Sequence, residues 1–78
     1  MRLDKFLKVS RVIKRRSVAN EAADNGRISI NGKIVKPSYE VKIGDIVEIK
    51  FGDKTSKFEI LQIPKVQTKD MGEIIKIL

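Results

Sequence analysis

The spacing of apolar residues changes at Gly26 of this 78-residue chain. Before this glycine, apolar residues recur three and four positions apart, as on one face of an α-helix. After it, they alternate with polar residues, as in a β-strand with one buried face. A chain of this length forms one domain, so helices and strands must share one core. The predicted class is therefore α+β, with two short N-terminal helices packed on a small, mainly antiparallel β-sheet.

Two helices are predicted within the first 25 residues, over residues 2–9 and 18–25. Ser17 is the expected N-cap of the second helix, because its hydroxyl can accept a hydrogen bond from the first turn. Gly26 is expected to end that helix in a left-handed conformation. The apolar positions behind these predictions are Leu3, Phe6 and Leu7 in the first helix and Val18, Ala19, Ala22 and Ala23 in the second.

The strands follow from alternation and from turn residues. Asn31-Gly32 predicts a type I′ hairpin. Val47, Ile49, Phe51 and Phe58 are expected to face the core. The predicted strands are residues 27–30, 33–35, 46–51 and 57–63, with a closing strand over 73–78, where a short helix is the alternative.

The predicted organisation is one binding domain over residues 1–63, followed by a C-terminal extension over 64–78. The extension is expected to be a loop and the closing strand, packed on the same domain.

The positive charge of the chain is concentrated in its first half. Residues 1–36 hold ten of the 17 basic and three of the ten acidic residues, which accounts for the whole net charge of +7. Such a concentration is typical of a site for a polyanion. Nucleic acid is the leading partner, and an anionic membrane surface is the alternative.

The candidate binding residues lie on the two predicted helices and around their connection. Arg15, Arg16 and Ser17 stand at the start of the second helix, where unpaired amides and the helix dipole favour phosphate. A solvated charge run is the structural alternative, but the arginine content favours phosphate binding. The candidate RNA-binding residues are Arg2, Lys5, Lys8, Arg11, Lys14, Arg15, Arg16, Ser17, Asn20 and Arg27.

The aromatic content indicates which nucleic acid is bound. Phe6, Phe51 and Phe58 are assigned to the core, which leaves Tyr39 as the one aromatic residue expected at the surface. Proteins that bind single-stranded nucleic acid need several exposed aromatic rings on which the bases stack. The sequence therefore favours binding to the phosphates and the shape of a structured RNA. It also predicts that Arg16→Glu abolishes binding and leaves the fold intact, as for any exposed residue.

The composition excludes several kinds of activity. The chain has no cysteine and no histidine, so it lacks a thiolate nucleophile, the commonest general base and the commonest metal ligand. No apolar run reaches the roughly 20 residues of a membrane span. We therefore expect a cytoplasmic protein that is not an enzyme and needs no metal, cofactor or small-molecule ligand.

Five segments, in order, resemble the S4 RNA-binding domain, which is named after the fourth protein of the small ribosomal subunit. They are residues 2–7 (RLDKFL), 14–17 (KRRS), 26–33 (GRISINGK), 36–38 (KPS) and 41–45 (VKIGD). The resemblance covers residues 1–63. It implies two helices on a small bent sheet, with RNA held along the helices and their connector.

The opening segment also resembles the heat-shock protein fifteen family and its shorter RqcP-type relatives. Phe6 alone remains of the aromatic residues of the first helix in the heat-shock members, and their long basic tail is absent, which favours the short type. This resemblance implies binding to ribosomal RNA of the large (50S) subunit, including the hairpin called helix sixty-nine, and to P-site peptidyl-tRNA. The tailing factor RqcH would bring alanyl-tRNA to the same particle.

The resemblance also assigns roles to individual residues. It implies that Asp4 orients Arg2 or a neighbouring lysine.

Two other functions stay open: another ribosomal-RNA-binding S4 protein, such as an assembly factor, and a protein-binding adaptor. We expect a monomer. The phosphate contacts that the resemblance implies are Arg2, Lys5, Arg15 and Arg16, with Lys8, Arg11, Lys14 and Arg27 as a wider rim.

Overall fold

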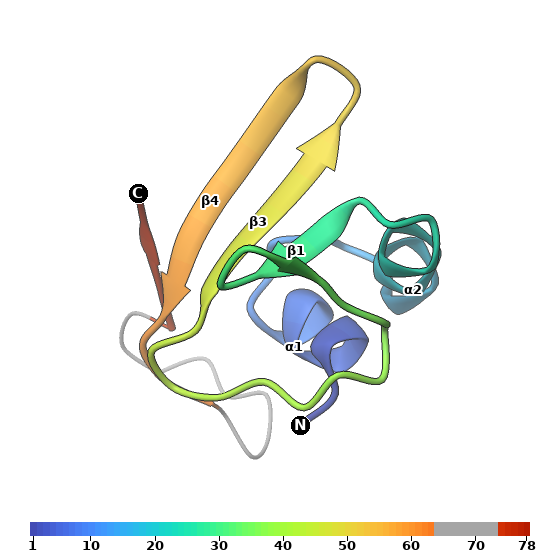
Figure 1. Cartoon of the computed structure of the whole chain (residues 1–78). Coiled ribbons are helices and arrows are strands. Elements are labelled where there is room, and N and C mark those ends of the chain that lie inside the picture. The colour runs from blue at the N-terminus through green and yellow to red at the C-terminus, as the bar shows by residue number, and fades with distance from the viewer. Residues whose placement is uncertain (64–73) are drawn as a thin grey trace.

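The computed structural model describes residues 1–63 and 74–78 (Figure 1). Both helices lie on one side of a sheet whose strand order is β2-β1-β3-β4-β5, and every described pairing is antiparallel. The α+β prediction is confirmed. The elements are α1 (Leu3–Val9), α2 (Arg16–Asp24), β1 (Ile28–Ile30), β2 (Lys33–Ile34), β3 (Ile46–Phe51), β4 (Lys54–Ile60) and β5 (Ile75–Ile77).

The start of α2 differs from the prediction. The helix begins at Arg16 and its N-cap is Arg15, so Ser17 lies inside the first turn and the predicted Ser17 cap is wrong. The carbonyl of Arg15 already accepts hydrogen bonds from the amides of Val18 (3.1 Å) and Ala19 (3.2 Å), which places the helix start two residues earlier.

The end of α2 was predicted correctly. Gly26 has a φ of 73°, in the left-handed region. Its amide donates to the carbonyl of Ala23, and the amide of Arg27 donates to that of Ala22, both over 3.0 Å. This pair of bonds is a Schellman motif, which ends the helix and turns the chain into β1.

The β1–β2 hairpin is confirmed, since Asn31 and Gly32 both have positive φ values (52° and 86°), as a type I′ turn requires. The second hairpin starts earlier than predicted. Phe51 pairs with Lys54 across Gly52 and Asp53, so β4 covers Lys54–Ile60 rather than residues 57–63.

The predicted closing strand is confirmed at β5, where Ile75 pairs with Ile60 and Ile77 with Phe58. The predicted loop over residues 65–72 lies outside the described residues, as does the start of the predicted extension.

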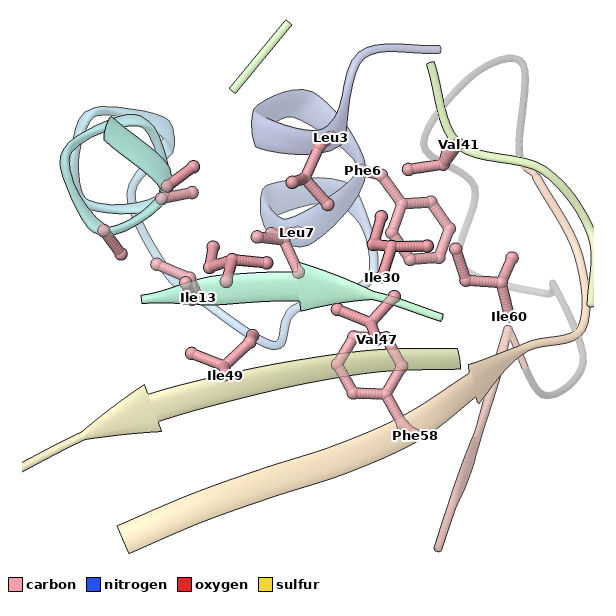
Figure 2. Packing of buried hydrophobic residues seen from close by; sticks show 14 residues of the cluster. Leu3, Phe6, Leu7, Ile13, Ile30, Val41, Val47, Ile49, Phe58 and Ile60 are labelled. Carbon is pink, nitrogen blue, oxygen red and sulfur yellow. The ribbon is translucent and has the colours of Figure 1, made fainter. Parts of the chain in front are cut away.

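The core lies between the helices and the sheet (Figure 2). The small side chains of Ala19, Ala22 and Ala23 bring α2 close to α1 and β1. The larger buried side chains are Leu3, Phe6 and Leu7 from α1, Ile28 and Ile30 from β1, Val47 and Ile49 from β3, and Phe58 and Ile60 from β4, with Ile13 and Val41 from connecting segments.

Two residues assigned to the core are exposed instead. Phe51 is 40% exposed and Val18 is 42% exposed. The pairing of β1 with β3 ends at Ile49, so Phe51 lies where β3 and β4 extend alone beyond the other strands (Figure 1). Val18 falls beside the alanine face of α2 rather than on it.

A buried carboxylate joins the first hairpin to the start of β3. Asp45 is 7% exposed and accepts hydrogen bonds from the backbone amide of Lys42 (2.9 Å) and the side-chain amide of Asn31 (3.2 Å). The hydroxyl of Tyr39 donates to the same carboxylate over 3.4 Å. Tyr39 is therefore half-buried and packed against the core, not the exposed ring that was expected.

Candidate RNA-binding face

Asp4, on α1, is the centre of the contact between the two helices. It is 2% exposed. Its carboxylate accepts hydrogen bonds from the backbone amide of Lys5 (2.8 Å) and the side-chain amide of Asn20 on α2 (3.1 Å). Two guanidinium groups also reach it, with Arg2 Nε and Arg16 Nη2 each 3.4 Å from Oδ1. The prediction that Asp4 orients Arg2 is consistent with these contacts, and Arg16 is a second partner.

The environment of Asp4 favours its charged form. Burial acts to raise the pKa of this carboxyl, but the bonds from Asn20, from the Lys5 amide and from Arg16 outweigh it and lower the pKa below its ordinary value of 3.8. Asp4 is thus a negative charge held under two cations.

The side chains of Arg2 and Arg16 each contact the buried Asp4 and are also partly exposed to solvent. Their side chains are 51% and 45% exposed, while that of Asp4 is 3% exposed. Arg2 is also fixed through its backbone, because it forms a bridge with Glu40 next to the bond between the Leu3 amide and the Tyr39 carbonyl (2.7 Å). Each guanidinium therefore has an inner side bonded to Asp4 and an outer side turned to solvent.

The connector between the helices contains an unusual backbone conformation. Arg11 has a φ of 65°, a left-handed value that is uncommon outside glycine. It follows the C-cap residue Ser10, and its amide donates to the carbonyl of Lys8 over 3.0 Å. Arg11 thus occupies the position where glycine usually ends a helix, and it presents an exposed cation there.

The first turn of α2 suits an anion. It contains no acidic residue, and within the described part of the chain no side chain caps it. Arg15 and Arg16 stand at this end and are both exposed. The helix dipole adds positive potential at the same place.

Most of the candidate residues are exposed and lie on α1, on the connector or at the start of α2. We call this surface the cationic face. Asn20 differs from the rest because it is half-buried and its amide bonds Asp4. Arg27 also lies apart, beyond the far end of α2, which has nine residues and is therefore about 13.5 Å long. The exposed residues of the cationic face are Arg2, Lys5, Lys8, Arg11, Lys14, Arg15, Arg16 and Ser17.

The sequence did not reveal two features of this region. The bond from Asn20 to Asp4 joins residues sixteen positions apart. The exposed ring of Phe51 lies beside Arg27 at the edge of a hollow. The glycine that ends α2 was the available signal for the second feature, because it sets where Arg27 emerges.

Within residues 1–63 and 74–78, no three acidic side chains gather in a group that could hold a metal ion. None of the helices in these ranges has the length and apolar character needed to cross a membrane.

Comparison with known protein families identifies this arrangement. The model of the S4 domain matches residues 1–47, which include both helices and the first hairpin. The chain belongs to the S4 domain family. The resemblance noted in the sequence is thereby confirmed, and the cationic face lies wholly within the matched residues.

This S4 chain has similar relatives that are named RQC P-site tRNA stabilizing factor. The one from Streptococcus pneumoniae is 51% identical over 79 residues, which cover 96% of this chain and 90% of the relative. The one from Listeria monocytogenes is 54% identical over 80 residues (97% and 87%). The one from Bacillus subtilis is 51% identical over 70 residues (90% and 81%).

Two solved structures share the fold. A trimeric structure of Vibrio cholerae heat shock protein 15 has a TM-score of 0.87 and 28% identity, and the match covers all of this chain and 81% of that one. The solution structure of the hypothetical protein HP1423 has a TM-score of 0.81 and 34% identity (100% and 96%). The two-helix S4 fold is thus shared over the whole chain, whereas the expected monomeric state stays a prediction.

Proposed function

We propose that this chain is a non-catalytic RNA-binding factor of bacterial ribosome-associated quality control. It binds ribosomal RNA and tRNA on obstructed large (50S) subunits in the cytoplasm and stabilises peptidyl-tRNA in the P-site during C-terminal alanine tailing. Relatives of about half-identical sequence over nearly their whole length carry the name RQC P-site tRNA stabilizing factor, which supports this proposal.

The observation that carries the proposal is the pairing of Arg2 and Arg16 over Asp4. Arg2 is the N-cap residue of α1 and Arg16 is the first residue of α2, and the shared carboxylate fixes their relative positions. A guanidinium held by one set of its N–H groups keeps the others for a phosphate oxygen. Ordering these long side chains before RNA arrives lowers the entropy lost on binding.

The proposed roles of the other residues follow from their places. Lys5 and Arg15 are proposed as phosphate contacts beside Arg2 and Arg16. Ser17 stands in the first turn of α2, where its hydroxyl can join the same site. Lys8, Arg11, Lys14 and Arg27 form a wider rim that raises the local concentration of RNA through its charge.

The proposed mechanism needs no chemical step. A protein that binds ribosomal RNA and a P-site tRNA together lowers the free energy of the tRNA in that one position. The helix sixty-nine hairpin and the tRNA are the proposed RNA partners, and RqcH is proposed to act on the same particle. The paired stem of a structured RNA offers phosphates and shape to the cationic face.

The test compares the binding of the purified protein to three particles: empty large subunits, large subunits carrying peptidyl-tRNA, and intact ribosomes. We expect the tightest binding to the subunits with peptidyl-tRNA. Equal binding to all three, or a preference for empty subunits, would contradict the proposal and favour a ribosome assembly factor.

A pair of matched variants tests whether the cationic face is the binding surface. Arg15→Glu reverses an exposed charge on that face, and Lys42→Glu makes the same change on the segment between β2 and β3. We expect Arg15→Glu to lose binding and Lys42→Glu to retain it. If both bound normally, the adaptor function would replace RNA binding.

A further inference from the structure

A hollow of about 200 Å³ lies between α2 and the end of β3. Two apolar side chains are exposed at this hollow, Val18 (42%) and Phe51 (40%). The residues that line it are Val18, Glu21, Ala22, Asn25, Arg27 and Phe51.

The helical side of the hollow is a single stripe along α2. Its members are spaced by three and four positions, so they share one face of the helix. The stripe begins at Val18, two residues after Arg16, and ends at Asn25, the C-cap. It therefore runs from the cationic end of α2 to the point where the chain turns into β1.

The opposite side of the hollow is fixed by backbone hydrogen bonds. The Schellman motif at Gly26 directs Arg27 away from the helix axis. The amide of Lys50 donates to the carbonyl of Arg27 over 2.9 Å, which holds the end of β3 beside it. Phe51 follows Lys50 and closes the hollow with its ring.

We propose that this hollow holds one unstacked nucleobase of the RNA that the cationic face binds. The ring of Phe51 offers a stacking surface, and the methyl groups of Val18 and Ala22 form the apolar wall. Glu21 and Asn25 carry acceptor and donor groups for the polar edge of a base. Arg27 stands at the rim, where it can bind the phosphate of the same nucleotide.

Size and charge favour a base over a peptide. Pockets for drug-sized ligands measure about 300–1,000 Å³, so this smaller hollow fits one flat ring system rather than a helix or an extended segment. The cation at its rim complements an RNA backbone. An RNA strand along α2 would meet cations at both ends of the helix, Arg15 and Arg16 at its start and Arg27 beyond its end. The inference rests on the proposed function for the identity of the RNA.

The first test uses the four ribonucleoside 5′-monophosphates as probes in an NMR titration of the full chain. We expect the ring signals of Phe51 and the methyl signals of Val18 and Ala22 to shift, and those of exposed Ile43 to stay unchanged. The probes carry a base and a phosphate, so ribose 5-phosphate is the matched ligand without a base. Equal shifts with ribose 5-phosphate would overturn the proposal.

The second test measures the binding of variants to large subunits carrying peptidyl-tRNA. Phe51→Leu removes the ring and keeps an apolar side chain, and we expect about 5- to 100-fold weaker binding. Phe51→Trp keeps a stacking ring and should bind as the natural chain does. Ile43→Ala removes a more exposed apolar side chain outside the hollow and should have no effect.

The outcomes separate this inference from the proposed function. If Phe51→Leu binds normally while Arg15→Glu does not, the hollow holds no base and the proposed function stands. If Phe51→Leu weakens binding but no nucleotide shifts the Phe51 signals, the hollow contacts a ribosomal protein and the base is excluded. If nucleotides bind the hollow but the chain shows no preference for peptidyl-tRNA particles, the base site stands and the proposed function fails.

Discussion

The guanidinium of Arg16, at the start of α2, lies 3.4 Å from the buried carboxylate of Asp4 on α1. Asp4 is 2% exposed, while the side chain of Arg16 is 45% exposed. One side of the arginine therefore contributes to helix packing and the other belongs to the cationic face. Under the proposed function, a change at Arg16 acts on stability and on RNA binding together.

Arg16→Glu should lower the free energy of unfolding, unlike a substitution at an ordinary surface site. The new carboxylate would stand next to Asp4, and removing the guanidinium would also leave a buried charge with one partner fewer. We expect a cost of at least about 1 kcal/mol, measured by urea denaturation. Arg15→Glu, at an exposed neighbour, should cost under about 0.5 kcal/mol.

This prediction differs from the expectation from sequence that Arg16→Glu leaves the fold intact, because Arg16 contacts the buried carboxylate of Asp4. Equal unfolding free energies for the Arg15 and Arg16 variants would mean that the contact with Asp4 contributes nothing. Binding should be measured on Arg16→Gln as well, because this variant removes the cation without placing a second acid beside Asp4.

The stability supplied by Asp4 should depend on pH. Bonds to Asn20, to the Lys5 amide and to Arg16 lower the pKa of this carboxyl below 3.8 in spite of its burial. A carboxyl with a lowered folded pKa stabilises the protein fully above its unfolded pKa, and the contribution is lost as pH falls through the folded pKa. At neutral pH, Asp4→Asn should therefore cost about 1–3 kcal/mol, as expected for a buried group that loses charged hydrogen bonds.

The difference in unfolding free energy between the natural chain and Asp4→Asn should become smaller as the pH falls below 3.8. Urea denaturation at a series of pH values measures this difference. A gap of constant size down to acid pH would show that the charge of Asp4 has no part in stability.

Much of the fold was predictable because it depends on neighbours in the sequence. The helical spacing around Leu3 and Phe6, the glycine that ends α2 and the Asn31-Gly32 turn are local signals, and each was confirmed. The exposure of Phe51 was not predictable in this way. It depends on β1 ending opposite Ile49, which is a property of the assembled sheet.

The candidate site divides in the same manner. The concentration of cations before position 36 predicted the cationic face, because charges along a short helical segment stay close together in space. The bonds of Asp4 to Arg16 and Asn20 were missed, since they join different helices. Asn20 was predicted as an RNA contact from its place near Arg16, but its side-chain amide donates a hydrogen bond to the buried carboxylate of Asp4.

Replacing Arg11 by glycine should stabilise the fold and weaken binding. Arg11 has a φ of 65°, which costs a residue with a side chain about 1 kcal/mol and costs glycine little. Arg11→Gly relieves this strain and removes one cation from the connector. Arg11→Ala removes the same cation and keeps the strain.

We expect both Arg11 variants to bind large subunits equally weakly, and only Arg11→Gly to unfold at higher urea concentration than the natural chain. If Arg11→Gly bound as tightly as the natural chain, the connector would lie outside the RNA contact. If Arg11→Ala were as stable as Arg11→Gly, the conformation would carry no strain.

Asp45 should matter for stability alone. Its carboxylate joins Asn31, Lys42 and Tyr39, and it lies away from the cationic face. Asp45→Ala should cost about 1–3 kcal/mol because three hydrogen-bond donors at this partly buried site lose their acceptor. Asp53→Ala, at an exposed turn position, should change the unfolding free energy by under about 0.5 kcal/mol.

Tyr39 gives a second measurement of the same contact. Burial and then the charge and hydrogen bond of Asp45 raise the pKa of this phenol above its ordinary value of 10.0. It is the one tyrosine of the chain, so its ultraviolet absorbance titrates it alone. Asp45→Ala should bring the pKa closer to 10.0, and an unchanged value would show that Asp45 does not act on Tyr39. Binding of the folded variant to large subunits should remain normal.

The salt dependence of binding should count the phosphates that the cationic face contacts. Neutralising a phosphate releases condensed counterions, so log affinity falls with log salt in proportion to the number of contacts. For about five contacts the expected slope is about −3.5 to −4.5.

Two variants separate phosphate contacts from base stacking in this measurement. Arg15→Gln should make the slope shallower by about one contact. Phe51→Leu should weaken binding at every salt concentration without changing the slope, because a stacked base releases no counterion. A slope near zero would contradict phosphate recognition and favour a protein-binding adaptor, and a shallower slope for Phe51→Leu would mean that its ring acts by positioning Arg27.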